Sequence, residues 1–205
     1  MPDATAIYER VQAGVRFFQG EILSHVIDRQ VHSVGANADG EEEFQFLGEV
    51  HEYAVILSQD CDLTQHHNAV IALEMDEARR RNAQLTHMLV VVAEPFESMK
   101  TRLGNGKQRE RVPQNKDERY QFLAGVPVEL DATGEGIPDL LLDFKRLFSV
   151  PAVVLAQRVT CGETKRRARL LTPYAEHLSV RFGHFYQRVG LDLDHHDARR
   201  TSTKE

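Results

Sequence analysis

The sequence is poor in cysteine and has no long apolar run. Its only cysteines, Cys61 and Cys161, are too few for a disulfide framework, which favours a reducing compartment. No stretch approaches the run of about 18 to 20 apolar residues that spans a bilayer. The start, Met1 to Ala4, lacks the basic residues and apolar region of a secretory signal. We therefore expect a soluble, cytoplasmic protein that makes no membrane contact.

Basic residues are missing from one long segment and concentrated in two others. Between Gln30 and Ala78 there is no Lys or Arg but there are 11 acidic residues. Lys100 to Arg119 holds seven basic residues against three acidic, and Arg158 to Arg169 holds five against one. These opposite fields predict either internal charge pairing, or a cation site in the acidic half and an anion-binding face in the basic half. The net charge of -6 disfavours non-specific binding of nucleic acid.

The length and composition suit one domain with a short tail. Hydrophobic residues make up 41% of 205 residues, which is enough for a core, and no internal repeat is present. Residues 1–191 are expected to form a single globular domain. Residues 192–205 are polar, contain His195 and His196, and are expected to be a disordered tail.

The order of the expected elements favours an α+β fold. Tyr53 to Leu57 is apolar on both faces, as in a fully buried strand. Strands do not alternate regularly with helices, so a bent antiparallel sheet or barrel with peripheral helices is expected. Further strands are expected at Asn68–Leu73, Met88–Ala93, Leu140–Val150 and Ala152–Val159, and helices at Ala4–Gln12, Asp76–Leu85 and Pro173–Val189.

One polar segment follows directly on the clearest buried strand. Ser58, Asp60, Cys61 and Asp62 can all hydrogen-bond, ionise or ligate, and a rigid strand would hold them in place. Two carboxylates beside a thiol raise its pKa, so Cys61 would need a neighbouring cation to act as a nucleophile.

Several kinds of chemistry fit this segment. Asp60 and Asp62 could bind a hard divalent cation such as magnesium, with Asp143 as a further ligand. Cys61 could ligate zinc with His66, His67 or Cys161, or could be a nucleophile that a histidine activates. The plain alternative is that Cys61 is a small buried hydrophobe and that the aspartates make turn or capping bonds.

The expected C-terminal helix carries a candidate anion site. Arg181 and Arg188 are seven residues apart and therefore share one helix face. They could clamp an anion, or they could pair with surface carboxylates.

Residues 18–62 resemble a known family. Phe18-Gln19-Gly20-Glu21-Ile22-Leu23 and Tyr53-Ala54-Val55-Ile56-Leu57-Ser58 are similar to the opening strands of the MazF/PemK toxins. The resemblance implies an SH3-like barrel, here with extra strands and a packing helix at the C-terminus. The family cleaves RNA with an arginine from an Arg-Pro step, and this chain has Glu52-Tyr53 there. The step Ser58-Gln59-Asp60-Cys61-Asp62 also resembles a Ser-Gln-x-Cys-Asp step of uncharacterised bacterial proteins.

Two functions follow as expectations. The first is an accessory or binding protein of a bacterial stress, mobile-element or defence locus, whose basic segments contact nucleic acid or a protein partner. The second is a hydrolase that acts on nucleic acid or a phosphoester through Asp60, Cys61, Asp62 and Ser58, with or without a metal.

Overall fold

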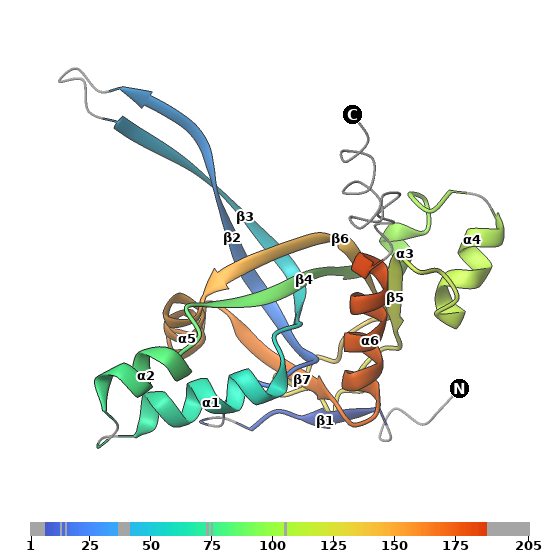
Figure 1. The fold of residues 1–205 in the computed structure, drawn as a ribbon. Coiled ribbons are helices and arrows are strands. Elements are labelled where there is room, and N and C mark those ends of the chain that lie inside the picture. The colour runs from blue at the N-terminus through green and yellow to red at the C-terminus, as the bar shows by residue number, and fades with distance from the viewer. Residues whose placement is uncertain are drawn as a thin grey trace, which may run out of the picture.

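The computed structural model has one seven-stranded sheet with helices on both faces (Figure 1). It describes residues 7–12, 14, 16–36, 42–72, 74, 76–104 and 106–187, with side chains for all of these except residues 30–36 and 42–46. The expected tail and Arg188 lie outside this range. The elements in chain order are β1 (Tyr8–Arg10), β2 (Glu21–Ala36), β3 (Glu42–Ile56), α1 (Asp60–Ile71), α2 (Glu77–Ala83), β4 (His87–Pro95), α3 (Phe96–Met99), α4 (Gly106–Arg111), the 3-10 turn η2 (Val112–Gln114), β5 (Tyr120–Leu123), β6 (Leu140–Pro151), α5 (Ala152–Thr160), β7 (Lys165–Leu170) and α6 (Tyr174–Gln187).

The sheet is entirely antiparallel, in the order β1-β7-β2-β3-β4-β6-β5. Because side chains alternate along a strand, its two faces build separate apolar clusters. Val55 and Val91 face the cluster that α6 covers, whereas Ala54, Ile56 and Val90 face the cluster of α1 and α5. The mixed α+β class and the buried strand at Tyr53 to Leu57 are therefore confirmed.

The sheet bends but does not close into a barrel. The hydroxyl of Tyr8, in edge strand β1, donates at 2.5 Å to the carbonyl of Ala124, the residue that follows the other edge strand, β5. Closure would need free backbone groups along β5. The Asn115 side chain instead bonds both the N–H and the carbonyl of Phe122, and Arg181 bonds the carbonyl of Tyr120. Side chains thus replace the missing strand pairing, and the expected closed barrel is wrong at this point.

Three expected elements have a different structure. The segment expected as the helix Ala4–Gln12 contains strand β1 instead, paired with β7. Residues 68–71 of the strand expected at Asn68–Leu73 lie in helix α1, and the strand expected at Ala152–Val159 lies in helix α5. In α5 the buried residues are Ala152 and Leu155, three apart, as a helix face requires. By contrast β4, α2 and α6 lie where the sequence predicts them.

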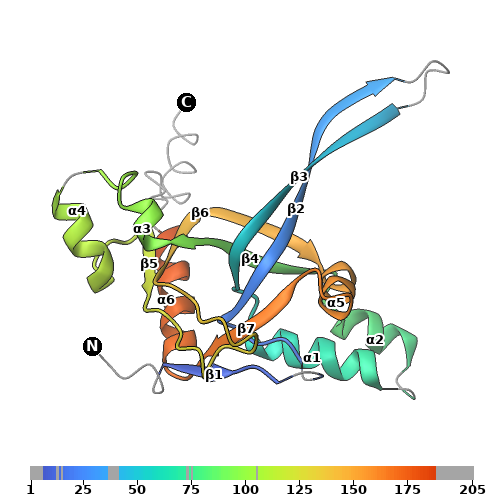
Figure 2. The same cartoon turned by 180° about the vertical axis from the view of Figure 1, so that it is seen from behind.

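Strands β2 and β3 continue beyond the sheet as a two-stranded arm, residues Val26–Ala36 and Glu42–His51 (Figures 1 and 2). Near the body, β2 pairs with β7 as far as Ser24 and β3 pairs with β4 as far as Tyr53. Beyond this point the two strands pair only with each other, in ten register pairs. The arm leaves the body at His25, whose φ of 59° lies in the left-handed region and turns the ribbon.

None of the helices in the described part of the chain is long and apolar enough to cross a membrane.

Candidate functional site

The segment predicted to carry chemistry is the first turn of helix α1 rather than an extended turn. Gln59 is the N-cap and makes no side-chain capping bond, and α1 begins at Asp60. Asp60 and Asp62 lie in the first turn, where negative charge interacts favourably with the helix dipole. The aspartates therefore have a structural reason to be here, whatever else they do.

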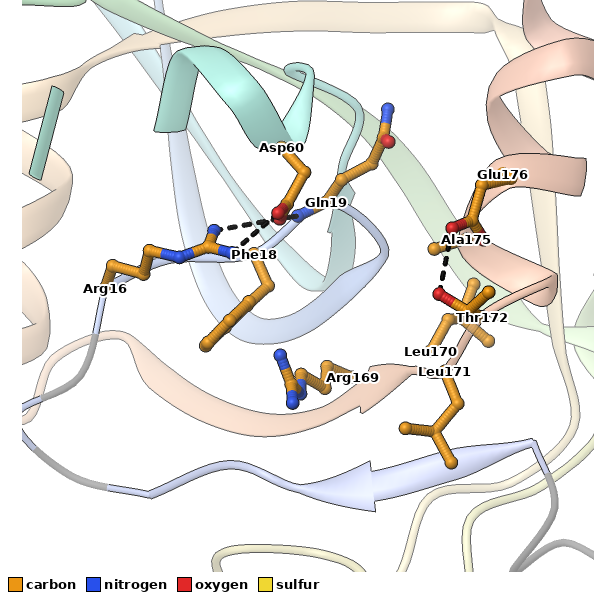
Figure 3. Close-up of a pocket in the computed structure, with 10 residues that line it drawn as sticks. All are labelled: Arg16, Phe18, Gln19, Asp60, Arg169, Leu170, Leu171, Thr172, Ala175 and Glu176. Carbon is orange, nitrogen blue, oxygen red and sulfur yellow. Dashed lines mark hydrogen bonds and ion pairs between the residues drawn. The ribbon is translucent and has the colours of Figure 1, made fainter. Parts of the chain in front are cut away.

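Asp60 is bound by an arginine that is distant in sequence (Figure 3). Nη1 and Nη2 of Arg16 donate to its two carboxylate oxygens at 2.8 and 2.6 Å, and the Gln19 N–H donates at 3.3 Å. The bonds from Arg16 are the main reason why the pKa of Asp60 lies below its ordinary value. At neutral pH, Asp60 is thus an ionised carboxylate with both oxygens engaged.

Figure 3 shows Phe18 between two guanidinium groups. The Cζ atoms of Arg16 and Arg169 lie 4.1 and 3.8 Å from the Phe18 ring centroid. Arg169 also donates to Glu9 at 2.9 Å. These groups line a small hollow with Thr172 and Glu176. Each arginine has its own carboxylate, so the hollow offers no unpaired positive charge from these two residues.

The other predicted residues point to different neighbours. The Ser58 hydroxyl accepts the N–H of Leu89 at 2.8 Å and so helps to hold β3 against β4. Cys61 is exposed, not buried, and its polar contacts are oxygens of Gln59 and Asp62, both at 3.6 Å. The expectation of a small buried hydrophobe at this position is therefore wrong.

His66 is occupied by a backbone bond. Its Nδ1 accepts the N–H of Leu85 at 3.1 Å, and burial is the main cause that lowers its pKa. Asp143, the third ligand expected for magnesium, is bound by Arg119 at 2.8 Å. Among the described residues, no three His, Cys, Asp or Glu side chains gather so as to hold a metal ion. The metal and hydrolase hypotheses remain predictions.

Arg181 has a definite role in the fold. Its two terminal nitrogens donate to the carbonyls of Asn115, Asp117 and Tyr120 at 2.6, 2.6 and 2.8 Å. It therefore ties α6 to the chain that precedes β5. Joint anion binding with Arg188 remains a prediction.

Most of the charge in the two basic segments is paired within the chain. Of their twelve basic residues, seven form an ion pair with a carboxylate; they are Lys100, Arg102, Arg119, Arg158, Arg166, Arg167 and Arg169. Internal pairing, one of the two alternatives that the charge pattern predicts, is therefore the dominant arrangement.

The most deeply buried ion pair among the described residues joins Asp131 to Arg167, which no sequence motif marks. Asp131 is fully buried and accepts Nε and Nη2 of Arg167 at 2.8 and 2.7 Å. Burial alone would raise the pKa of Asp131, but the bonds from Arg167 and Thr133 outweigh it and lower the pKa. The available signal was local, because Asp131 is followed by Thr133 and Gly134, as in an aspartate-centred turn.

Comparisons with protein-family models, curated proteins and solved structures find no match to this chain.

Proposed function

We propose that the protein is a non-catalytic binding module that docks its β2–β3 arm on a protein partner. The observation that carries this proposal is the arm itself, ten register pairs without a third strand. At about 3.4 Å per residue the arm is roughly 30 Å long. A two-stranded ribbon is marginally stable in water, so an arm of this length gains from a surface to pack against.

The register of the arm gathers apolar positions on one face. Directly opposed residues of an antiparallel pair share a face, and so do residues two apart on one strand. On β3, positions 44, 46 and 50 share a face, and their partners on β2 are positions 34, 31 and 27. The bulge between positions 31 and 33 shifts the alternation by one residue, so position 34 lies on the same face as position 31. The six residues are Ile27, Val31, Val34, Phe44, Phe46 and Val50.

The apolar character extends onto described side chains of β3. Val50, on this face, is 55% exposed, and Leu47, on the opposite face of the arm, is 59% exposed. Apolar side chains this exposed in one protruding element favour a contact surface over a core.

The charge of the segment indicates the chemistry of the partner. From Val26 to His51 there are six acidic residues and one basic residue, Arg29. A phosphate backbone would be repelled, so nucleic acid is disfavoured for the arm. A protein surface with an apolar strip bordered by Lys and Arg would complement both features. The proposal therefore replaces the basic segments with the acidic arm as the contact surface.

The proposal does not include RNA cleavage or hydrolysis. Glu52 stands where the MazF/PemK family has its catalytic arginine. The polar contacts of the Cys61 thiol are with carbonyl and carboxylate oxygens rather than with an imidazole. These observations support binding over catalysis at the two places where the sequence suggested an enzyme.

The test compares two equally exposed apolar residues. Val50→Glu places a charge on the arm, and Ile71→Glu, at 59% exposure on α1, is the matched control. A partner identified by crosslinking from position 50 is purified and titrated against each variant by calorimetry. We expect Val50→Glu to weaken binding by about tenfold or more, Ile71→Glu to leave it unchanged, and added salt to weaken it.

Three results would contradict the proposal. The first is equal loss of affinity in both variants. The second is a dimer of this chain, seen by light scattering, that only Val50→Glu dissociates, because the occupant would then be a second copy. The third is micromolar binding of a single-stranded RNA that Val50→Glu does not weaken.

A further inference from the structure

Strand β6 passes the base of the arm (Figure 1), and one histidine of the arm packs against it. His51 is the arm residue of β3 that lies nearest the body, and its ring centroid is 4.9 Å from that of Phe148 on β6. His51 is 6% exposed, and its register partner on β2, Val26, is fully buried. The first pair of the arm is therefore buried against the body, although residues 47–50 of β3 are exposed.

The two ring nitrogens of His51 have different surroundings. Nδ1 lies 3.5 Å from Oε1 of Glu49, two residues away on the same strand. Nε2 is shielded from solvent and has no hydrogen-bond partner among the described residues. A neutral imidazole with its proton on Nδ1 fits both positions, because it points its N–H at a carboxylate and needs no acceptor at Nε2. An imidazolium would add a charged N–H at Nε2, where no acceptor among those residues meets it.

Charged groups from four strands surround this ring. The arm supplies Glu49 and, opposite it in the register, the buried Asp28. Arg146 of β6 joins arm and body, because its Nη2 lies 3.6 Å from Glu49 and its Nη1 donates to Glu94 of β4 at 2.6 Å. Burial is the largest influence on the pKa of His51 and lowers it, as Arg146 does, although the three carboxylates act in the opposite direction. The packed base of the arm therefore holds the neutral ring.

We propose that the base of the arm is a pH-sensitive switch, in which neutral His51 holds the arm against β6 and protonated His51 releases it. Release lets Nε2 reach water, which removes the cost of a buried N–H without an acceptor. Arg146 separates from Glu49 but keeps Glu94, so the movement leaves no cation unpaired. The arm swings about His25, where the left-handed backbone already turns the ribbon.

The direction of the switch follows from the titration of His51 in the two states. In the released arm the ring titrates near its ordinary pKa of about 6.5, whereas in the packed arm its pKa is lower. The packed arm is therefore fully favoured above about pH 6.5. As the pH falls further, the ratio of packed to released arm decreases by at most about tenfold for each pH unit, because release binds one proton. The inference rests on the proposed function only for its consequence, that acid changes how the apolar face of the arm meets its partner.

The test measures the position of the arm with no partner present. Cys61 and Cys161 are replaced by serine, and spin labels are attached to cysteines at the exposed positions of Leu47 on the arm and Val180 on α6. Pulsed electron paramagnetic resonance then gives the distance between the labels at about pH 7.5 and about pH 5, on either side of the ordinary histidine pKa. We expect one distance at the higher pH. A second population should appear below about pH 6.5 and grow by up to about tenfold for each pH unit.

Three variants identify the group that responds. His51→Phe keeps an aromatic ring against Phe148 but cannot take up a proton, so its arm should stay packed at both pH values. His87→Phe removes an exposed histidine of β4, and His25→Asn retains a residue type that tolerates the left-handed backbone; both should respond as the natural chain does. An NMR titration of the His51 ring in the natural chain needs no variant and decides the matter if His51→Phe does not fold. Its midpoint should lie below the ordinary value of about 6.5.

Any of five results would overturn the inference. They are an unchanged distance in the natural chain, a change that persists in His51→Phe, a change that is lost in His25→Asn or His87→Phe, a His51 midpoint at or above its ordinary value, and release that begins only near about pH 4, where carboxylates titrate. Because no partner is present, the test is independent of Val50→Glu. An arm that does not move leaves the binding proposal standing, and an arm that moves but binds no partner contradicts that proposal alone.

Discussion

Asp131 and Asp60 each accept two hydrogen bonds from a single arginine, yet their surroundings differ. Asp131 is fully buried and accepts six hydrogen bonds, from Arg167, Thr133 and the N–H groups of Glu135 and Gly136. Asp60 has a side chain that is 48% exposed and accepts three, two from Arg16 and one from Gln19. The first pair fastens β7 to the loop before β6, and the second fastens α1 to the chain before β2.

The difference shows where an ion pair matters to this fold. A buried charge without its partner keeps the full cost of desolvation, whereas water can replace the partner of a half-exposed one. The segment that the sequence predicts to carry a functional site contains the more exposed of the two ion pairs, Asp60 with Arg16. The deeper pair is carried by residues that no motif marks.

Removal of the buried carboxylate should have the largest effect. Asp131→Ala leaves the Arg167 guanidinium, 4% exposed, without its buried carboxylate partner and with only the largely exposed Glu135 carboxylate, 3.2 Å away. We expect the free energy of unfolding to fall by about 3 to 5 kcal/mol, measured by urea denaturation. The double variant Asp131→Leu with Arg167→Met should lose less than Asp131→Ala alone, because it leaves no buried charge. A loss below about 1 kcal/mol for Asp131→Ala would show that this pair does not differ from the exposed one.

Local signals predicted part of this fold and long-range pairing decided the rest. The helical spacing of the apolar residues of α6 lies within one segment, and so does the apolar run of β4. The sequence predicted strands in parts of α1 and α5 because these segments contain β-branched residues, which favour strands. In the structure the β-branched residues Ile71 and Val153 lie exposed on helix surfaces. Asp131 and Arg167 meet across 36 residues, through a sheet order that no local pattern contains.

Removal of the half-exposed carboxylate should have a smaller effect. We expect Asp60→Ala to lower the free energy of unfolding by about 0.5 to 1 kcal/mol, after allowance for screening by water. Arg16 lowers the pKa of Asp60 in the folded state, so its contribution is complete above the ordinary pKa of about 4 and is lost as the pH falls below it. The difference in stability between Asp60→Ala and the natural chain, measured from unfolding curves, should therefore be larger at pH 7 than at pH 3. A difference that grows on acidification would contradict this sign.

The smallest effect is expected at Cys61, in the same helical turn. The thiol is exposed, and its contacts at 3.6 Å with Gln59 and Asp62 are weak, so Cys61→Ser should change the free energy of unfolding by less than about 0.5 kcal/mol. Elemental analysis of both purified proteins tests the zinc hypothesis at the same time. We expect equal metal content in the two, because Asp60 is held by Arg16 and His66 by the Leu85 N–H, so neither is poised to ligate beside the thiol. Stoichiometric zinc that disappears with the thiol would make this turn a metal centre, and the arginine pairing of Asp60 would then be a support for that centre rather than an alternative to it.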